Sequence, residues 1–176
     1  MVHPGDDLAE MILQSLARLG LELQDGDVLV LAQKIVSKSE GRLCNLAMVQ
    51  PSEKAIDLAA HAEKDPRLME LVLQESREVL RVRPGSVIVE HRLGFVCANA
   101  GIDHSNVAGE GTADEEWVLL LPVNPDASAE KLRLKLESAS HTRLGVLIID
   151  SHGRAWRLGV VGATIGLSGM PGLVDM

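Results

Sequence analysis

The sequence predicts an α+β fold, in which a mixed β-sheet is flanked by helices. Segments with helical spacing of apolar residues alternate with short apolar runs of strand length. Glycine-containing turns around Gly94 and between residues 151 and 159 predict antiparallel hairpins, which favour α+β over a purely parallel α/β sheet. Apolar residues make up 46% of the chain, enough for an aliphatic core. The length of 176 residues fits one domain, or two small ones sharing a sheet, and we treat residues 1–176 as one domain.

The first predicted helix covers residues 8–19, where Asp7 is the N-cap and Gly20 the stop. A turn at residues 25–27 leads into an apolar run at 28–32, which predicts a buried strand. The polar segment 33–41 is expected to leave this strand as a loop.

Two helices and two strands are predicted in the next part of the chain. A helix opens at Pro51 and runs to about residue 61, and a second opens at Asp65 and runs to about residue 80. After a turn at 84–85, strands are predicted at 87–90 and 95–98, joined by a short hairpin.

Residues 99–116 are rich in Gly, Asp and Asn and predict a long loop, of a length that is typically functional. A strand at 117–121 and a helix at 125–141 follow. The apolar run 144–149 predicts a buried strand that ends at Asp150. The glycine-rich segment 158–165 predicts a strand that another backbone approaches closely.

Charge and composition exclude several classes of protein. The net charge is −8, and no cluster of Lys and Arg exists, which argues against nucleic-acid binding. No signal peptide or membrane-length apolar run is present, so a cytoplasmic protein without membrane contact is expected. Cys44 and Cys97 lie far apart, which predicts buried free thiols.

The segment 33–42 concentrates cations and hydroxyls directly after a predicted strand. Lys34, Lys38 and Arg42 are accompanied by two serines. Such groups at a strand end can hold phosphate oxygens. The spacing is not that of a Walker loop, and a solvated polar turn is the alternative interpretation.

A second candidate site lies at residues 99–106. Asp103 is a hard oxygen ligand, and the amide of Asn106 could orient a phosphate or a water molecule. Magnesium ions are typically bound by one or two carboxylates together with substrate phosphates. An Asx-rich turn that caps a short helix is the alternative.

The third candidate site begins where an apolar strand leads to Asp150. A hydroxyl on Ser151 and two guanidinium groups on Arg154 and Arg157 follow. A carboxylate at a buried strand end is costly unless a cation neutralises it, and arginines suit bidentate contact with phosphate or carboxylate. A structural ion pair between Asp150 and one arginine is the alternative.

Three histidines have no assigned role. His91 lies in a charged segment, 90–92, that fits either substrate contact or a hairpin with surface charges. His104 is expected at the surface or behind the metal ligands, and His152 directly follows the third candidate site.

Together and in this order, these motifs resemble the coenzyme F-420:L-glutamate ligase family, also called F-420-0:gamma-glutamyl ligase. The blocks that carry the resemblance are AQKIVSKSEGR at 32–42, DPRLMELVLQESREVLRVRPG at 65–85, IVEHRLGFVCANAGIDHSNV at 88–107 and DSHGRAWRLGVVG at 150–162. The similarity covers nearly the whole chain, from Gly5 to Asp175.

The resemblance implies a gamma-glutamyl ligase-like α+β fold, a homodimer, GTP as co-substrate, and Mg²⁺ or Mn²⁺. It implies an acid–amino-acid ligase that joins L-glutamate to a deazaflavin coenzyme precursor through an acyl phosphate. The implied metal-site residues are Asp103, Asp150 and Ser151; the implied GTP contacts are Gln33, Lys34, Lys38 and Asn106. Arg154 is assigned to the anionic substrate on chemical grounds as the catalytic residue.

The chain departs from the family pattern at both ends. Family members usually begin with a further strand and continue well past the position of Asp175. A chain shortened in this way leaves open a second hypothesis, in which a non-catalytic protein keeps nucleotide binding or dimer formation.

Overall fold

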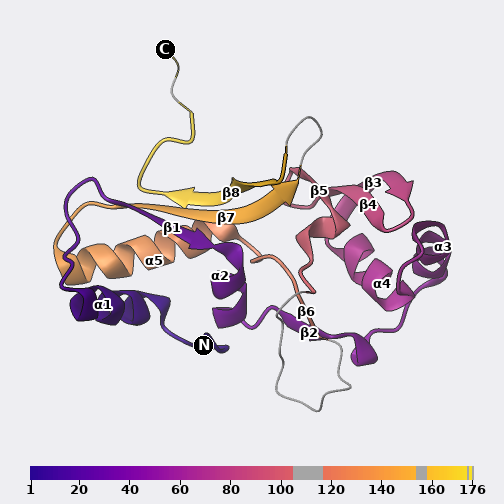
Figure 1. Cartoon of the computed structure of the whole chain (residues 1–176), viewed down its shortest axis with the longest axis horizontal. Coiled ribbons are helices and arrows are strands. Elements are labelled where there is room, and N and C mark those ends of the chain that lie inside the picture. Colours follow the sequence, from indigo (N-terminus) through magenta and orange to yellow (C-terminus); the bar gives the residue numbers. More distant parts are fainter. Residues whose placement is uncertain (105–116, 154–157, 174, 176) are drawn as a thin grey trace. The chain divides into compact units, whose positions relative to one another are not determined.

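The computed structural model describes residues 1–104, 117–153, 158–173 and 175. The chain divides into two compact units, which are described separately. Unit 1 comprises Met1–Arg42 and Leu121–Met176, and unit 2 comprises Leu43–Leu120. Figure 1 labels the helices and strands of both.

Unit 1 contains a mixed three-stranded sheet in the order β1-β7-β8. Its elements are α1 (Leu8–Leu19), β1 (Val28–Ala32), α2 (Gln33–Ser39), α5 (Pro125–Ser140), β7 (Gly145–Gly153) and β8 (Val160–Ser168). Strand β1 runs parallel to β7, whereas β8 pairs with β7 antiparallel. The predicted α+β class with mixed pairing is therefore confirmed.

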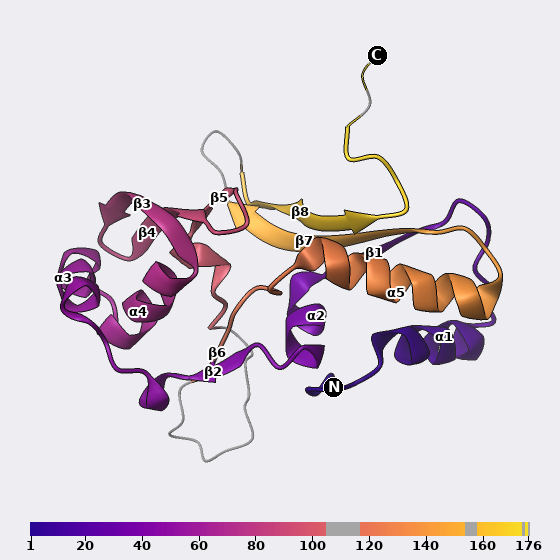
Figure 2. The ribbon, with the colours of Figure 1, turned by 180° about the vertical axis from the view of Figure 1, so that it is seen from behind.

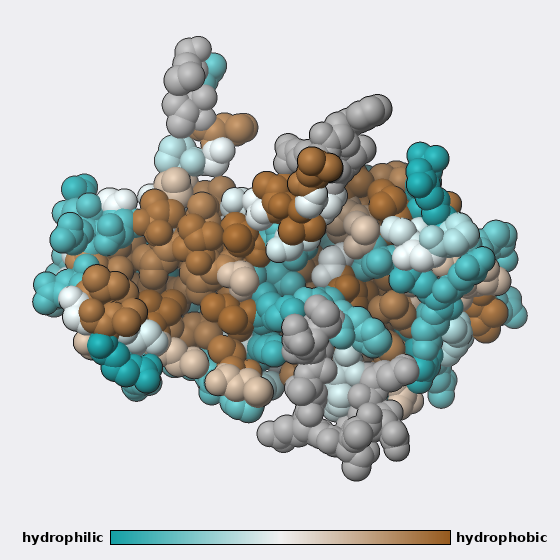
Figure 3. Space-filling view, viewed as in Figure 1, coloured by the Kyte–Doolittle hydropathy of each residue, from teal (hydrophilic) through white to brown (hydrophobic). Residues whose placement is uncertain are grey.

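The helices of unit 1 cover one face of this sheet. Figure 2 shows α5 running lengthwise alongside β1 and β7. Buried residues of β1, β7, α1, α2 and α5 form the core between them: Ala9, Leu31, Val36, Ala129, Leu132, Leu136, Leu144, Val146 and Ile148. On the other face, Val28 and Val30 of β1 remain 45% and 56% exposed. Figure 3 shows apolar residues gathered over this sheet.

The first turn of α5 lies directly against β8 at Gly166. A Cβ atom built on Gly166 would lie 2.5 Å from the backbone carbon and oxygen of Pro125. In the same turn, Asp126 Oδ1 accepts a hydrogen bond of 2.8 Å from the backbone N–H of Leu167. The predicted strand is confirmed, but the close approach of another backbone is at Gly166, just beyond the predicted segment 158–165, within which Gly162 meets only the side chain of Ile149.

Unit 2 contains two small antiparallel sheets, β3-β4-β5 and β2-β6. Its elements are β2 (Leu43–Asn45), the 3-10 helix η1 (Leu46–Met48), α3 (Glu53–Ala62), α4 (Pro66–Gln74), β3 (Ser76–Arg83), β4 (Ser86–His91), β5 (Val96–Ala98), the 3-10 helix η2 (Asn99–Gly101) and β6 (Trp117–Leu119).

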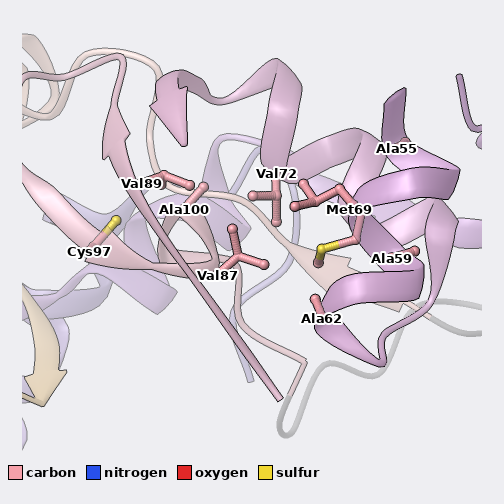
Figure 4. Packing of buried hydrophobic residues seen from close by; sticks show 10 residues of the cluster. Ala55, Ala59, Ala62, Met69, Val72, Val87, Val89, Cys97 and Ala100 are labelled. Carbon is pink, nitrogen blue, oxygen red and sulfur yellow. The ribbon is translucent and has the colours of Figure 1, made fainter. Parts of the chain in front are cut away.

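Small and aliphatic side chains fill the core of unit 2 (Figure 4). Met69 and Val72 of α4 meet Val87 and Val89 of β4, and all four are fully buried. Cys97 is buried and Cys44 is half-buried, and the two do not form a disulfide bond. In the described part of the chain, no helix is both long enough and apolar enough to cross a membrane.

The predicted loop at 33–41 is wrong, because residues 33–39 form helix α2. Gln33, Val36 and Ser37 are buried at helical spacing, and no Gly or Pro interrupts the segment. Gly41, with φ of +68°, lies just beyond the C-cap. The polar character of the segment concealed this helical period.

The predicted helix to residue 80 is also wrong, since α4 ends at Gln74 and β3 begins at Ser76. Strand β3 has irregularities between 76 and 78 and between 79 and 81, where its pairing with β4 shifts. Its partly buried residues, Ser76, Val79 and Val82, therefore recur every three residues and imitate a helical period.

Candidate functional site

The parallel pairing of β1 with β7 brings two of the predicted motifs to the same end of one sheet. Ala32 is paired with Ile149, so Gln33 and Asp150 are the next residues on neighbouring strands. Gln33 begins α2, and Asp150 continues along β7. Ligands bind preferentially at the carboxyl ends of parallel strands in such sheets.

Helix α2 presents the cations of the first motif from this end of the sheet. Lys34 and Lys38 are both half-buried and lie one turn apart, which places them on one side of the helix. Gln33 is only 3% exposed, and its Oε1 accepts a hydrogen bond of 2.9 Å from Ser37 Oγ. Gln33 is thus held by its own helix.

Asp150 is not at the end of its strand, contrary to expectation. Strand β7 continues to Gly153 because β8 pairs with it along this whole stretch, including Asp150 with Ala163. The carboxylate of Asp150 is half-buried, and its Oδ2 lies 2.8 Å from His152 Nε2. The apolar run of the sequence stops at Ile149, but the hydrogen-bonded pairing of β7 with β8 continues to Gly153.

The partner of Asp150 that the structure describes is a histidine. The alternative interpretation paired Asp150 with Arg154 or Arg157, but both lie outside the described residues. A sequence signal for His152 did exist, since residues two apart on a strand share a face. Ser151 is exposed and points to the opposite face, so its hydroxyl is not brought beside the carboxylate of Asp150.

Asp103 belongs to unit 2, where its backbone is fixed by a bridge to β6. Its N–H donates to Leu119 O at 2.9 Å, and its carbonyl oxygen accepts from Leu119 N at 2.8 Å. His104 is exposed, as expected, and Asn106 lies outside the described residues. Asp103 and Asp150 are each placed within their own unit.

The predicted metal ligands are carboxylates, which are the right kind of ligand for a hard divalent cation, but they are too few to hold one alone. Within residues 1–104, 117–153, 158–173 and 175, no group of three or more His, Cys, Asp or Glu could hold a metal ion. Of the predicted metal ligands, unit 2 contains the half-buried Asp103 and unit 1 the half-buried Asp150. One or two carboxylates completed by phosphate oxygens and water is the usual arrangement for Mg²⁺.

A buried polar cluster in unit 2 was not expected from the sequence. Glu75 and His91 are 6% and 0% exposed, so the description of 90–92 as a hairpin with surface charges is wrong for His91. Arg92 Nη2 lies 3.0 Å from Glu75 Oε2, and the His91 ring stacks on Phe95 at 5.2 Å. This cluster fastens the β4–β5 hairpin to the end of α4.

The fold and site define an α+β protein with a mixed sheet, in which the lysine-bearing helix α2 and Asp150 directly follow paired residues of the parallel strands β1 and β7. The family model described as F420-0:Gamma-glutamyl ligase matches residues 1–176. The chain belongs to this family.

Named relatives agree with this assignment. The chain is 47% identical over 174 residues to "Coenzyme F420:L-glutamate ligase" of Methanopyrus kandleri, covering 99% of this chain and 65% of the relative. The proteins of the same name from Methanothermobacter thermautotrophicus and Archaeoglobus fulgidus are each 43% identical over 175 residues. In both, the match covers 99% of this chain, and it covers 67% and 66% of the relatives. The chain therefore spans about two thirds of the length of these curated relatives.

Proposed function

We propose that the protein takes part in the GTP-dependent ligation of L-glutamate to a deazaflavin coenzyme F-420 precursor, forming a γ-linked amide. The names of the relatives support the substrate class. The observation that carries the proposal for this chain is the parallel register of β1 and β7, which puts the start of α2 and Asp150 at one end of a sheet.

The reaction needs an activated carboxylate, because a free carboxylate is a poor electrophile. One oxygen of the precursor's terminal carboxylate attacks the γ-phosphorus of GTP, and GDP leaves with the electron pair of the broken bond. The amine of L-glutamate then attacks the acyl carbon of the acyl phosphate. Inorganic phosphate leaves, the nitrogen loses a proton, and an amide remains.

The residues of this chain supply charge and position in that scheme. Lys34 and Lys38 of α2 would contact the triphosphate, as would Gln33, which is bonded to Ser37 within the helix. Asp150 of unit 1 and Asp103 of unit 2 are each proposed as a carboxylate ligand of Mg²⁺ or Mn²⁺. A bound divalent ion neutralises phosphate charge during phosphoryl transfer.

The other assignments, like those above, are predictions from the family resemblance and from chemistry. Ser151 would complete the metal site, although its hydroxyl lies on the face opposite the carboxylate of Asp150. Asn106 would contact GTP, and Arg154 would bind the anionic substrate.

The direct test incubates the protein with GTP, Mn²⁺, L-glutamate and the deazaflavin precursor, and measures GDP and the glutamylated product. We expect both products in equal amounts, and Asp150→Asn should reduce their formation by more than about tenfold. Asp27→Asn is the matched control, since Asp27 precedes β1 at the opposite end of the sheet and accepts a hydrogen bond from Gln24 N.

Absence of both products in the unaltered protein would refute the ligase function. GTP binding without product would support the non-catalytic hypothesis instead. Equal activity in the two aspartate variants would remove Asp150 from the site.

We also propose that the protein forms a homodimer through the outer face of the unit 1 sheet. The exposed apolar residues Val28 and Val30 support this, because a monomer gains no stability from leaving them in water. Val30→Lys should shift the sedimentation coefficient toward that of the monomer. Val123→Lys is the control, because Val123 is also 56% exposed but precedes α5. A dimer unaffected by Val30→Lys would exclude this face.

A further inference from the structure

The residues just before Asp103 adopt an unusual backbone conformation. Asn99, Ala100 and Gly101 have φ angles of +49°, +54° and +66°, three left-handed residues in succession. Glycine adopts this conformation readily and asparagine tolerates it, but alanine does so only at a cost in energy. Such a conformation persists where the surrounding structure enforces it, and it is typical of functional sites.

Two contacts enforce the left-handed turn. Asn99 Oδ1 accepts a hydrogen bond of 3.1 Å from the backbone N–H of Val87. This bond directly follows the pair Ile88–Ala98, at which the ladder between β4 and β5 ends. The methyl group of Ala100 is fully buried in the core of unit 2, where Figure 4 shows it beside Val87 and Val89.

The turn is followed almost at once by a second fixed point. Ile102 N donates to Asn99 O at 3.1 Å, and the next residue, Asp103, exchanges two hydrogen bonds with Leu119. Only Gly101 and Ile102 separate the buried methyl group of Ala100 from the bridge at Asp103. The backbone that carries Asp103 is therefore held on both sides.

We propose that Asn99 is a positioning residue for the metal site: its side chain holds the left-handed turn, and the turn fixes the backbone from which Asp103 presents its carboxylate. This inference rests on the proposed role of Asp103 as a metal ligand. Asn99 acts on the ion through the main chain alone. Its effect should appear in metal affinity and not only in the stability of unit 2.

The test titrates Mn²⁺ into the protein with GTP, without the other substrates, and follows free Mn²⁺ by electron paramagnetic resonance. Asn99→Gly keeps the left-handed turn accessible but removes the acceptor for Val87 N–H, and we expect Mn²⁺ to bind about fivefold more weakly. Asn99→Asp keeps both an acceptor oxygen and tolerance of positive φ, so it should restore binding.

Asn124→Gly is the matched control, because Asn124 Oδ1 also accepts a 3.1 Å hydrogen bond from a backbone N–H, that of Ala127 at the start of α5. It should leave Mn²⁺ affinity unchanged. Hydrogen exchange supplies a metal-free readout: the amide protons of Asp103 and Leu119 should exchange faster in Asn99→Gly than in the unaltered protein.

The outcomes separate this inference from the proposed function. If Asp103→Asn weakens Mn²⁺ binding but Asn99→Gly changes neither affinity nor exchange, the positioning role is refuted and the ligase proposal stands. If Asp103→Asn leaves Mn²⁺ binding intact, Asp103 is not a ligand, and both proposals fail at this residue.

Discussion

Replacing Gly166 by alanine should destabilise unit 1 through the start of α5. The new Cβ would lie 2.5 Å from two backbone atoms of Pro125, whereas an ordinary contact begins at 3.4 Å, so the backbone must retreat by about 0.9 Å. Neither atom belongs to a flexible side chain. Overpacking of this kind costs about 1–3 kcal/mol of unfolding free energy. Better strand propensity of alanine offsets only a part of that cost.

Gly145→Ala is the control, because it makes the same change in the same sheet. There the new Cβ would meet Met170 Sδ at 3.1 Å and Val28 Cγ2 at 3.2 Å, which are side-chain ends that can move. We expect its unfolding free energy to stay within about 1 kcal/mol of the unaltered protein. Urea denaturation followed by circular dichroism measures both variants. If Gly166→Ala were no less stable than Gly145→Ala, the reasoning from backbone contact would be refuted.

Three further predictions concern acid sensitivity, core packing and a histidine tautomer. The bonded guanidinium of Arg67 lowers the pKa of Asp65 below its usual 3.8, so this pair stabilises unit 2 above that pH and ceases to do so as pH falls through the lowered value. The unaltered protein should therefore lose more unfolding free energy between about pH 4 and pH 2 than Asp65→Asn, and parallel pH curves would contradict this. Leu136 of α5 is 0% exposed and Leu134 is 52% exposed. In urea denaturation, Leu136→Ala should therefore lower the unfolding free energy by about 3 kcal/mol and Leu134→Ala by less than about 1 kcal/mol. Equal losses in the two variants would show that α5 is packed differently. His91 Nδ1 accepts a 3.0 Å hydrogen bond from the backbone N–H of Leu93. Nitrogen NMR should therefore find a neutral His91 ring with its proton on Nε2. A proton on Nδ1 would disprove this tautomer.

Features encoded by neighbouring residues were predictable from the sequence. Asp7 caps α1 with hydrogen bonds to two backbone amides, and Gly20 ends that helix in the left-handed conformation, as expected from residue type alone. Helix α5 begins at Pro125 for the same kind of local reason.

Features that depend on distant partners were not predictable. The end of α4 and the start of β3 are decided by pairing with β4, and bulges there produced a misleading period. The strand around Asp150 extends beyond its apolar run because β8 pairs with it. In the candidate site, residue types pointed to Gln33 and Asp150, but their proximity follows from a register that no local pattern encodes.

The pairing of Val28 with Gly145 has a consequence for how the chain folds during synthesis. The two residues are 117 positions apart, and the intervening chain includes the whole of unit 2, which is a single continuous segment. Unit 2 can fold first, and Leu43 then pairs with Leu119, which brings its two ends together. The long loop between β1 and β7 is thereby shortened, and the entropy lost on closing it falls. The parallel ladder between β1 and β7 can form only after the ribosome has released β7.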